Sequence, residues 1–190
     1  MKKQTIIGIC ALFALFVLAS SFSAAETEEE PRFEPPILLT SAGQSAEVQL
    51  AAVLLKRTGL AYDLVKTAEP KDLAGKKTLI FVLGTSLKGL GAAGLDLDQE
   101  KKRVGVLLDE AKAQSTPIMC LHLGGEARRG TLSDELIEAV LPSAQAAIVV
   151  ITGNKDGFFT QITEAGSIPL IEVERAADAL QPLKDAFQVQ

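Results

Sequence analysis

Short apolar runs alternate with segments of helical periodicity along most of this 190-residue chain, and this alternation restricts the fold more than any other feature. Such runs are typical of strands that are buried on both faces of a sheet. The run at 62–66 instead alternates apolar and polar residues, which indicates an edge strand. The sequence predicts strands at 37–41, 62–66, 79–83, 118–123, 146–151 and 170–173.

Helical segments separate these strands. Val48, Ala51 and Leu55 repeat at helical spacing, and Gly59 is a stop signal for that helix. The pattern predicts helices at 44–58, from a cap at Asp98 to about 114, from a cap at Ser133 to Pro142, at 157–165 and at 178–187, with one turn at most at 70–74. Strands that alternate with helices predict an α/β protein with a three-layer doubly wound parallel sheet, Rossmann-like or flavodoxin-like. We expect five to six strands in the order 2-1-3-4-5, with the sixth strand at an edge.

The first 25 residues have the three parts of a secretory signal: a basic start, an apolar run that is short for a membrane span, and small residues before Glu26. An uncleaved membrane anchor is the alternative. We expect cleavage after Ala25, an acidic, proline-bearing linker at 26–36, one domain at 37–190, and a periplasmic or extracellular location. The processed chain has one cysteine, Cys120, which lies among apolar residues and should be a buried thiol that reacts slowly.

The charge of the chain excludes some partners. The net charge is −5, and it becomes −7 once Lys2 and Lys3, the charged residues of the signal, are removed. An acidic chain with one tyrosine and no tryptophan is a poor candidate for binding nucleic acid. No segment after the signal is long and apolar enough to span a membrane.

Glycines, hydroxyls and basic residues gather after four of the predicted strands, where ligands bind in doubly wound folds. Four glycines lie in the eleven residues of 84–94, which we interpret as a loop that lets the backbone approach a ligand. Backbone N–H groups and guanidinium groups together predict a site for a small anion. The expected ligand-binding residues are Ser41, Gln44, Ser45, Thr85, Ser86, Lys88, Gly89, Gly91, His122, Gly124, Gly125, Arg128, Arg129, Asn154, Lys155 and Asp156. The alternative is that the glycines make tight turns and the arginines pair with Glu126 and Asp134.

Motifs that would indicate a specific cofactor or reaction are not supported by the sequence. Residues 89–94 match the dinucleotide pattern G-x-G-x-x-G, but the match begins well after its strand and not at the start of a helix. There is no phosphate-binding G-x-x-x-x-G-K-[ST] loop, so we expect no cofactor, and we expect no metal site. A Ser41 or Ser86 nucleophile with His122 as base would need Asp156 or Glu126 to orient the histidine, and no G-x-S-x-G elbow supports it.

Four stretches that occur in order, 40–45, 88–94, 122–130 and 154–160, resemble a family of exported bacterial proteins known as a domain of unknown function. The resemblance covers about residues 37–187. It implies export and a single α/β domain, supports one site made by the four loops, and brings no catalytic residues.

Three functions remain open at this point. The first is an exported module that binds a small anionic ligand, with a membrane transport protein as a possible partner. The second is a hydrolase or transferase at the same strand ends, with His122 and Asp156 as acid and base. The third is a protein-interaction module.

Overall fold

The computed structural model describes residues 33–189 and contains one sheet of six parallel strands in the order β2-β1-β3-β4-β5-β6. This order confirms the predicted doubly wound fold with the sixth strand at an edge. The strands are β1 (Ile37–Ala42), β2 (Tyr62–Leu64), β3 (Thr78–Leu83), β4 (Ile118–His122), β5 (Ala146–Val150) and β6 (Leu170–Val173).

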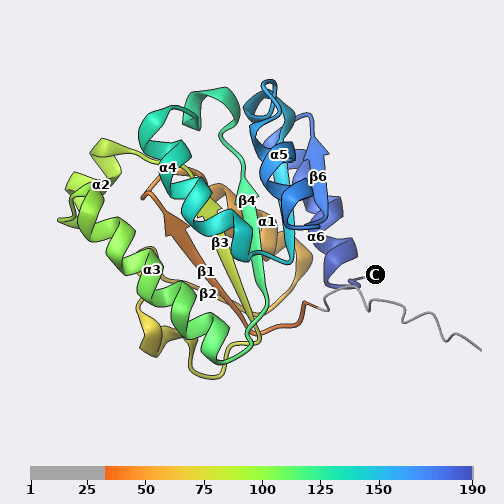
Figure 1. The fold of residues 1–190 in the computed structure, drawn as a ribbon. Helices are drawn as coiled ribbons and strands as arrows, with labels where there is room; N and C mark the ends of the chain where they lie inside the picture. Colours follow the sequence, from red (N-terminus) through yellow and green to blue (C-terminus); the bar gives the residue numbers. More distant parts are fainter. Residues whose placement is uncertain (1–32, 190) are drawn as a thin grey trace, which may run out of the picture.

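Helices cover both faces of the sheet (Figure 1). The α-helices are α1 (Glu47–Thr58), α2 (Leu87–Ala93), α3 (Leu97–Ala113), α4 (Thr131–Val140), α5 (Phe158–Ala165) and α6 (Leu180–Ala186). Short 3-10 helices are η1 (Pro70–Leu73), η2 (Gly125–Arg128), η3 (Leu141–Ser143), η4 (Ile151–Gly153) and η5 (Ala176–Ala179).

Each face of the sheet has its own apolar core because side chains alternate along every strand. On one face, Leu79, Phe81 and Leu83 of β3 belong to a core with α3, α4 and α5. On the other face, Ile80 and Val82 of the same strand belong to a core with α1 and α6. The central strands are buried throughout, which explains their unbroken apolar sequence.

Several predicted boundaries were wrong. Residues 87–93 form helix α2 and not an open loop, because Ser86 caps it by accepting a hydrogen bond from the Gly89 N–H. Helix α3 begins after Asp96, which forms a capping box with Gln99, and not after Asp98. Helix α4 begins after Gly130, so Ser133 lies inside the first turn and is not the cap. Helix α1 begins at Glu47, later than predicted.

The residues just before β1 pack against the domain instead of extending as a linker. Phe33 is buried, and its ring centroid lies 5.8 Å from that of Phe187 at the end of α6. The Glu34 N–H donates to the Thr78 hydroxyl oxygen at 3.0 Å, and the Thr78 hydroxyl donates to the Glu34 carbonyl at 2.8 Å. The predicted signal and the rest of the predicted linker lie outside the described residues. Between Phe33 and Val189, no helix has both the length and the apolar character that crossing a membrane requires.

Candidate functional site

The crevice between β1 and β3, where doubly wound folds commonly bind ligands, is closed by direct contact between the loops that follow these strands. The Gly84 N–H donates to the Ala42 carbonyl at 3.0 Å, and the Ser86 N–H donates to the Gly43 carbonyl at 2.8 Å. Gly43 has a φ of 108°, and a Cβ there would lie 2.4 Å from the Gly84 carbonyl oxygen. Gly43 therefore lets the two backbones meet, and this contact leaves no room for a ligand between them.

A buried ion pair fastens this closed crevice from the side of α3. Glu100 is fully buried, and one of its carboxylate oxygens accepts hydrogen bonds from the Gly43 N–H at 2.9 Å and the Gln44 amide at 3.1 Å. Arg103 donates to both oxygens of Glu100 at 2.8 Å, and also to the Ser41 and Ala68 carbonyls. The carboxylate at the crevice is therefore that of Glu100 and not that of a ligand.

Gln44 and Thr85, two of the predicted ligand-binding residues of these loops, have structural partners. Gln44 donates to Glu100 and to the Lys66 carbonyl. The Thr85 N–H donates to the Ser133 hydroxyl oxygen, and the Thr85 hydroxyl donates to the Leu132 carbonyl. Ser41 and Ser45 are buried beneath the surface. Lys88 is exposed on α2, and no ion pair forms at it among residues 33–189.

The glycines of α2 have different surroundings from those expected. A Cβ at Gly89 would lie 1.9 Å from the Gln44 carbonyl oxygen, so this glycine lets α2 approach the loop after β1. A Cβ at Gly91 would meet no atom within 4 Å. Close backbone approach therefore explains Gly89 and does not explain Gly91.

The loops after β4 and β5 also meet through glycines. A Cβ at Gly125, whose φ is 56°, would lie 2.2 Å from the Thr152 hydroxyl oxygen. A Cβ at Gly153 would lie 2.8 Å from the His122 ring. These contacts hold η2 and η4 against each other at the carboxyl edge, which is the edge of the sheet where the strands end.

His122 lies fully buried beneath these two loops. Its Nδ1 is 3.1 Å from the Leu83 carbonyl oxygen and its Nε2 is 3.0 Å from the Gly125 carbonyl oxygen. Its ring centroid is 4.8 Å from that of Phe159 in α5. Burial lowers the pKa of His122 and outweighs the two carbonyl contacts, which raise it. Both ring nitrogens are therefore engaged inside the protein.

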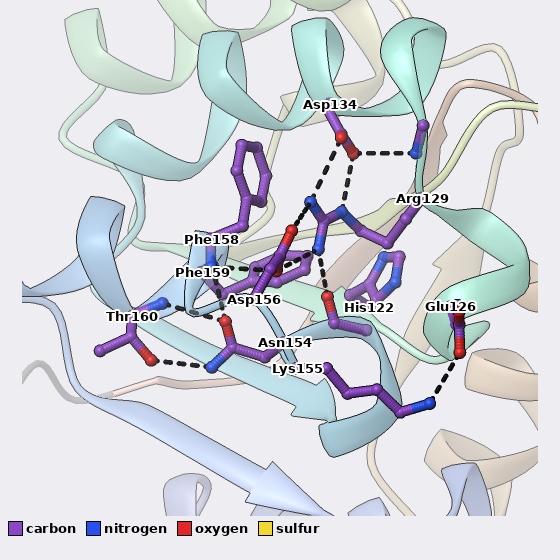
Figure 2. A network of polar contacts seen from close by, with 12 residues as sticks. His122, Glu126, Arg129, Asp134, Asn154, Lys155, Asp156, Phe158, Phe159 and Thr160 are labelled. Carbon is purple, nitrogen blue, oxygen red and sulfur yellow. Dashed lines mark hydrogen bonds and ion pairs between the residues drawn. The ribbon is translucent and has the colours of Figure 1, made fainter.

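Arg129 is the centre of the polar network at the carboxyl edge (Figure 2). Its Nε donates to Asp134 at 2.7 Å, and its Nη2 donates to the second oxygen of Asp134 at 3.2 Å. Its Nη1 donates to the Gly153 carbonyl. The guanidinium carbon lies 4.1 Å from the ring centroid of Phe158, within the range of a cation–π contact. These contacts fix the inner side of the guanidinium group.

The outer side of the same guanidinium group meets Asp156. Nη1 and Nη2 of Arg129 donate to the two oxygens of Asp156 at 3.0 Å each. The Arg129 side chain is 12% exposed, whereas that of Asp156 is 62% exposed. The hydrogen bonds from Arg129 lower the pKa of Asp156 to about 2, so this carboxyl group stays ionised near neutral pH and is a weak base.

A pocket of about 340 Å³ opens at this network. We call it the Arg129 pocket. It is lined by Glu126, Arg129, Gly130, Asp134, Thr152, Gly153, Lys155 and Asp156. Its lining comes from the region after β4 and the loop after β5, so two of the four predicted loops contribute to it.

The other predicted residues of these loops lie outside the pocket or are paired. Arg128 donates from Nε to both oxygens of Glu47 at the start of α1. Lys155 forms an exposed ion pair with Glu126. The Asn154 side-chain oxygen accepts hydrogen bonds from the Phe159 and Thr160 N–H groups in the first turn of α5. Gly124 packs against the Arg128 side chain.

Sequence reasoning missed several polar residues that form these contacts, because no motif marks them in the sequence. Glu47, Glu100 and Thr152 carry no motif. Asp134 entered only as a pairing alternative for the arginines, and Arg129 does pair with it. The capping spacing from Asp96 to Gln99 would have placed the start of α3, and with it Glu100 in the first turn. Within residues 33–189, no group of three His, Cys, Asp or Glu side chains is arranged to hold a metal ion.

The fold and the pocket together define a doubly wound α/β domain with a charged pocket at the carboxyl edge. The chain belongs to the family described as a domain of unknown function (DUF6305), whose model matches residues 34–187. This match confirms the predicted membership of a family known as a domain of unknown function. No curated protein matches the chain in sequence.

Several solved structures resemble this chain at low similarity. A carbohydrate kinase from Agrobacterium tumefaciens is 9% identical with a TM-score of 0.38, and the match covers 75% of this chain and 55% of the kinase. The chain thus spans about half the length of that kinase. AlinE4, an SGNH-hydrolase family esterase, is 11% identical with a TM-score of 0.30 and 78% coverage of each chain. A GDSL-like lipase from Bacteroides thetaiotaomicron VPI-5482 is 11% identical with a TM-score of 0.34, covering 77% of this chain and 74% of the lipase.

Proposed function

We propose that this chain is an exported binding protein for a small ligand with a carboxylate or phosphate group, and that this group binds Arg129 in place of Asp156. The proposal depends on one observation. The outer two N–H groups of Arg129 form a planar fork that holds an exposed carboxylate, Asp156, at the Arg129 pocket. A carboxylate or phosphate of a ligand has the geometry to occupy the same fork.

The fork is already held in the orientation that a ligand needs. Asp134, the Gly153 carbonyl and the Phe158 ring fix the inner side of the guanidinium group. A binding group that is ordered before the ligand arrives loses little conformational entropy on binding. Asp156 is largely exposed, so water can hydrate its carboxylate when a ligand takes its place on Arg129. This hydration lowers the energetic cost of replacing Asp156 with a ligand carboxylate.

Asp156→Asn tests the proposal because it removes the competing charge. An asparagine at this position keeps an oxygen that can accept from the Phe158 N–H, which Asp156 now does at 3.2 Å. We expect Asp156→Asn to bind acetate, succinate or inorganic phosphate about tenfold tighter than the wild type, measured by isothermal titration calorimetry. Arg129→Lys should weaken the same binding, since an ammonium group lacks the planar fork.

Arg175 and Asp178 supply the controls. They form a similar ion pair outside the Arg129 pocket, on the exposed surface near η5. Asp178→Asn and Arg175→Lys should leave the affinity for every probe unchanged. If none of the three probes binds the wild type or Asp156→Asn, or if Asp156→Asn binds no tighter than Asp178→Asn, the proposal is wrong.

A further inference from the structure

The Arg129 pocket contains more negative than positive charge. Arg129 and Lys155 are its cations, and Glu126, Asp134 and Asp156 are its carboxylates. A ligand with only negative charge would add to a lining that already has a net charge of −1 from these five groups. Like charges at close range repel one another. The pocket therefore suits a ligand that carries both signs of charge.

The displaced Asp156 carboxylate identifies where the positive group of such a ligand would lie. The hydrogen bond from the Phe158 N–H to Asp156 anchors this carboxylate next to the pocket. When a ligand takes its place on Arg129, Asp156 loses its cationic partner while remaining ionised. A carboxylate without a cationic partner at a pocket favours a nearby ammonium group. In an α-amino acid, the ammonium group is separated from the carboxylate by a single carbon.

Resting on the proposed function, we infer that the ligand of the Arg129 pocket is a free α-amino acid. Its α-carboxylate binds the outer fork of Arg129, and its α-ammonium group pairs with the displaced Asp156. The volume of about 340 Å³ lies at the small end of ligand pockets. The lining consists of charged side chains, glycines and Thr152, without a large apolar side chain. These features favour an amino acid with a small or polar side chain, such as serine.

Three matched probes test the inference on the processed chain. L-serine carries both charges, glycerate has a hydroxyl in place of the ammonium group, and ethanolamine lacks the carboxylate. We expect calorimetry to show that L-serine binds at least about tenfold tighter than either of the other two, since each lacks one ion pair. The same comparison with L-alanine, lactate and ethylamine repeats the test without the side-chain hydroxyl.

Asp156→Asn separates this inference from the proposed function. In this variant the preference for L-serine over glycerate should shrink toward unity, because the partner of the ammonium group is gone while the fork of Arg129 remains. If glycerate and lactate bind the wild type as tightly as the amino acids, the ligand is a simple carboxylate; the inference fails and the proposed function stands. If the preference for L-serine persists unchanged in Asp156→Asn, the assigned role of Asp156 is wrong. If no probe binds either protein, both proposals fail.

Discussion

Two carbonyl oxygens lie against the ring nitrogens of His122. A neutral imidazole ring has only one N–H group to donate to them. Burial is the main cause that lowers its pKa below the ordinary value. The unfolded chain then binds more protons than the folded chain between the ordinary pKa of about 6.5 and the lower folded value. Stability is unaffected above this window and is lost as the pH falls through it.

We therefore expect the free energy of unfolding of the wild type to decrease when the pH is lowered from 7.5 to 5.5. His122→Asn removes the titrating group, so its free energy of unfolding should change less over the same range, whatever its absolute stability. Urea denaturation at both pH values measures this difference. The window lies above the range in which Asp156 and Glu47 titrate, because the pKa values of both carboxyls are lowered. Equal pH slopes for the two proteins would contradict the assignment to His122.

At the scale of single residues, the sequence predicted which polar residues lie at the strand ends better than it predicted which of them pair with one another. The sequence identified Arg129, Lys155 and Asp156 as polar residues at a strand end, and the structure brings all three to one pocket. It did not predict that Asp156 would hold the fork of Arg129. Pairing of this kind depends on loop conformations that residue types alone do not determine. The buried position predicted for Cys120 is confirmed, and burial raises the pKa of its thiol.

Helix α2 is the element whose role differs most from the sequence-based interpretation. Its glycines suggested an open loop for a ligand, yet one of them serves helix-to-loop packing and another lies in open space. Glycine lowers helix propensity, and this hid a short helix that the Ser86 cap and packing against the loop after β1 stabilise.

Two substitutions in α2 should therefore have opposite effects. Gly91→Ala adds a methyl group where no atom lies within 4 Å, and should raise the free energy of unfolding by about 0.5–1 kcal/mol through helix propensity. Gly89→Ala forces a Cβ against the Gln44 carbonyl oxygen, and should lower the free energy of unfolding by about 1–3 kcal/mol. Urea denaturation gives both values. If Gly89→Ala is as stable as Gly91→Ala, α2 does not depend on this close contact.

The strands and helices were predictable because the local sequence pattern indicates strand burial and helix periodicity. The strand order followed from right-handed crossovers between parallel strands. Helix starts were less predictable, since 95–98 and 130–134 each offer more than one residue type that can cap or begin a helix. In α4, Ser133 was the apparent cap, but its hydroxyl instead accepts a hydrogen bond from the Thr85 N–H.

At the scale of the whole molecule, the proposed function includes export, which the first 25 residues predict. We expect the mature chain to begin at Glu26, because small residues precede it at the end of the predicted signal. Intact-mass measurement of the protein from the periplasm or medium should show the loss of residues 1–25. Recovery of the uncut chain from the membrane fraction would support the anchor alternative instead.

The crevice closed by Glu100 explains why only two of the four predicted loops line the Arg129 pocket. Fold-level reasoning places ligands at the switch point between β1 and β3, but here a buried carboxylate of α3 and two touching loops occupy that point. The Arg129 pocket lies farther along the same edge, after β4 and β5. A buried glutamate in a helix gives no sign in the sequence of which loop it will bind.

Phe33 and Phe187, near the two ends of the folded domain, are in contact, with their ring centroids 5.8 Å apart. A connection between them would make the domain a closed ring. A short glycine-serine bridge could connect these two points, and the ring could be reopened at Gly75, where a Cβ would meet no atom within 4 Å. Both segments that line the Arg129 pocket would remain uncut in such a circular permutant. The spatial order of the strands in this domain therefore should not depend on the residue at which the chain begins.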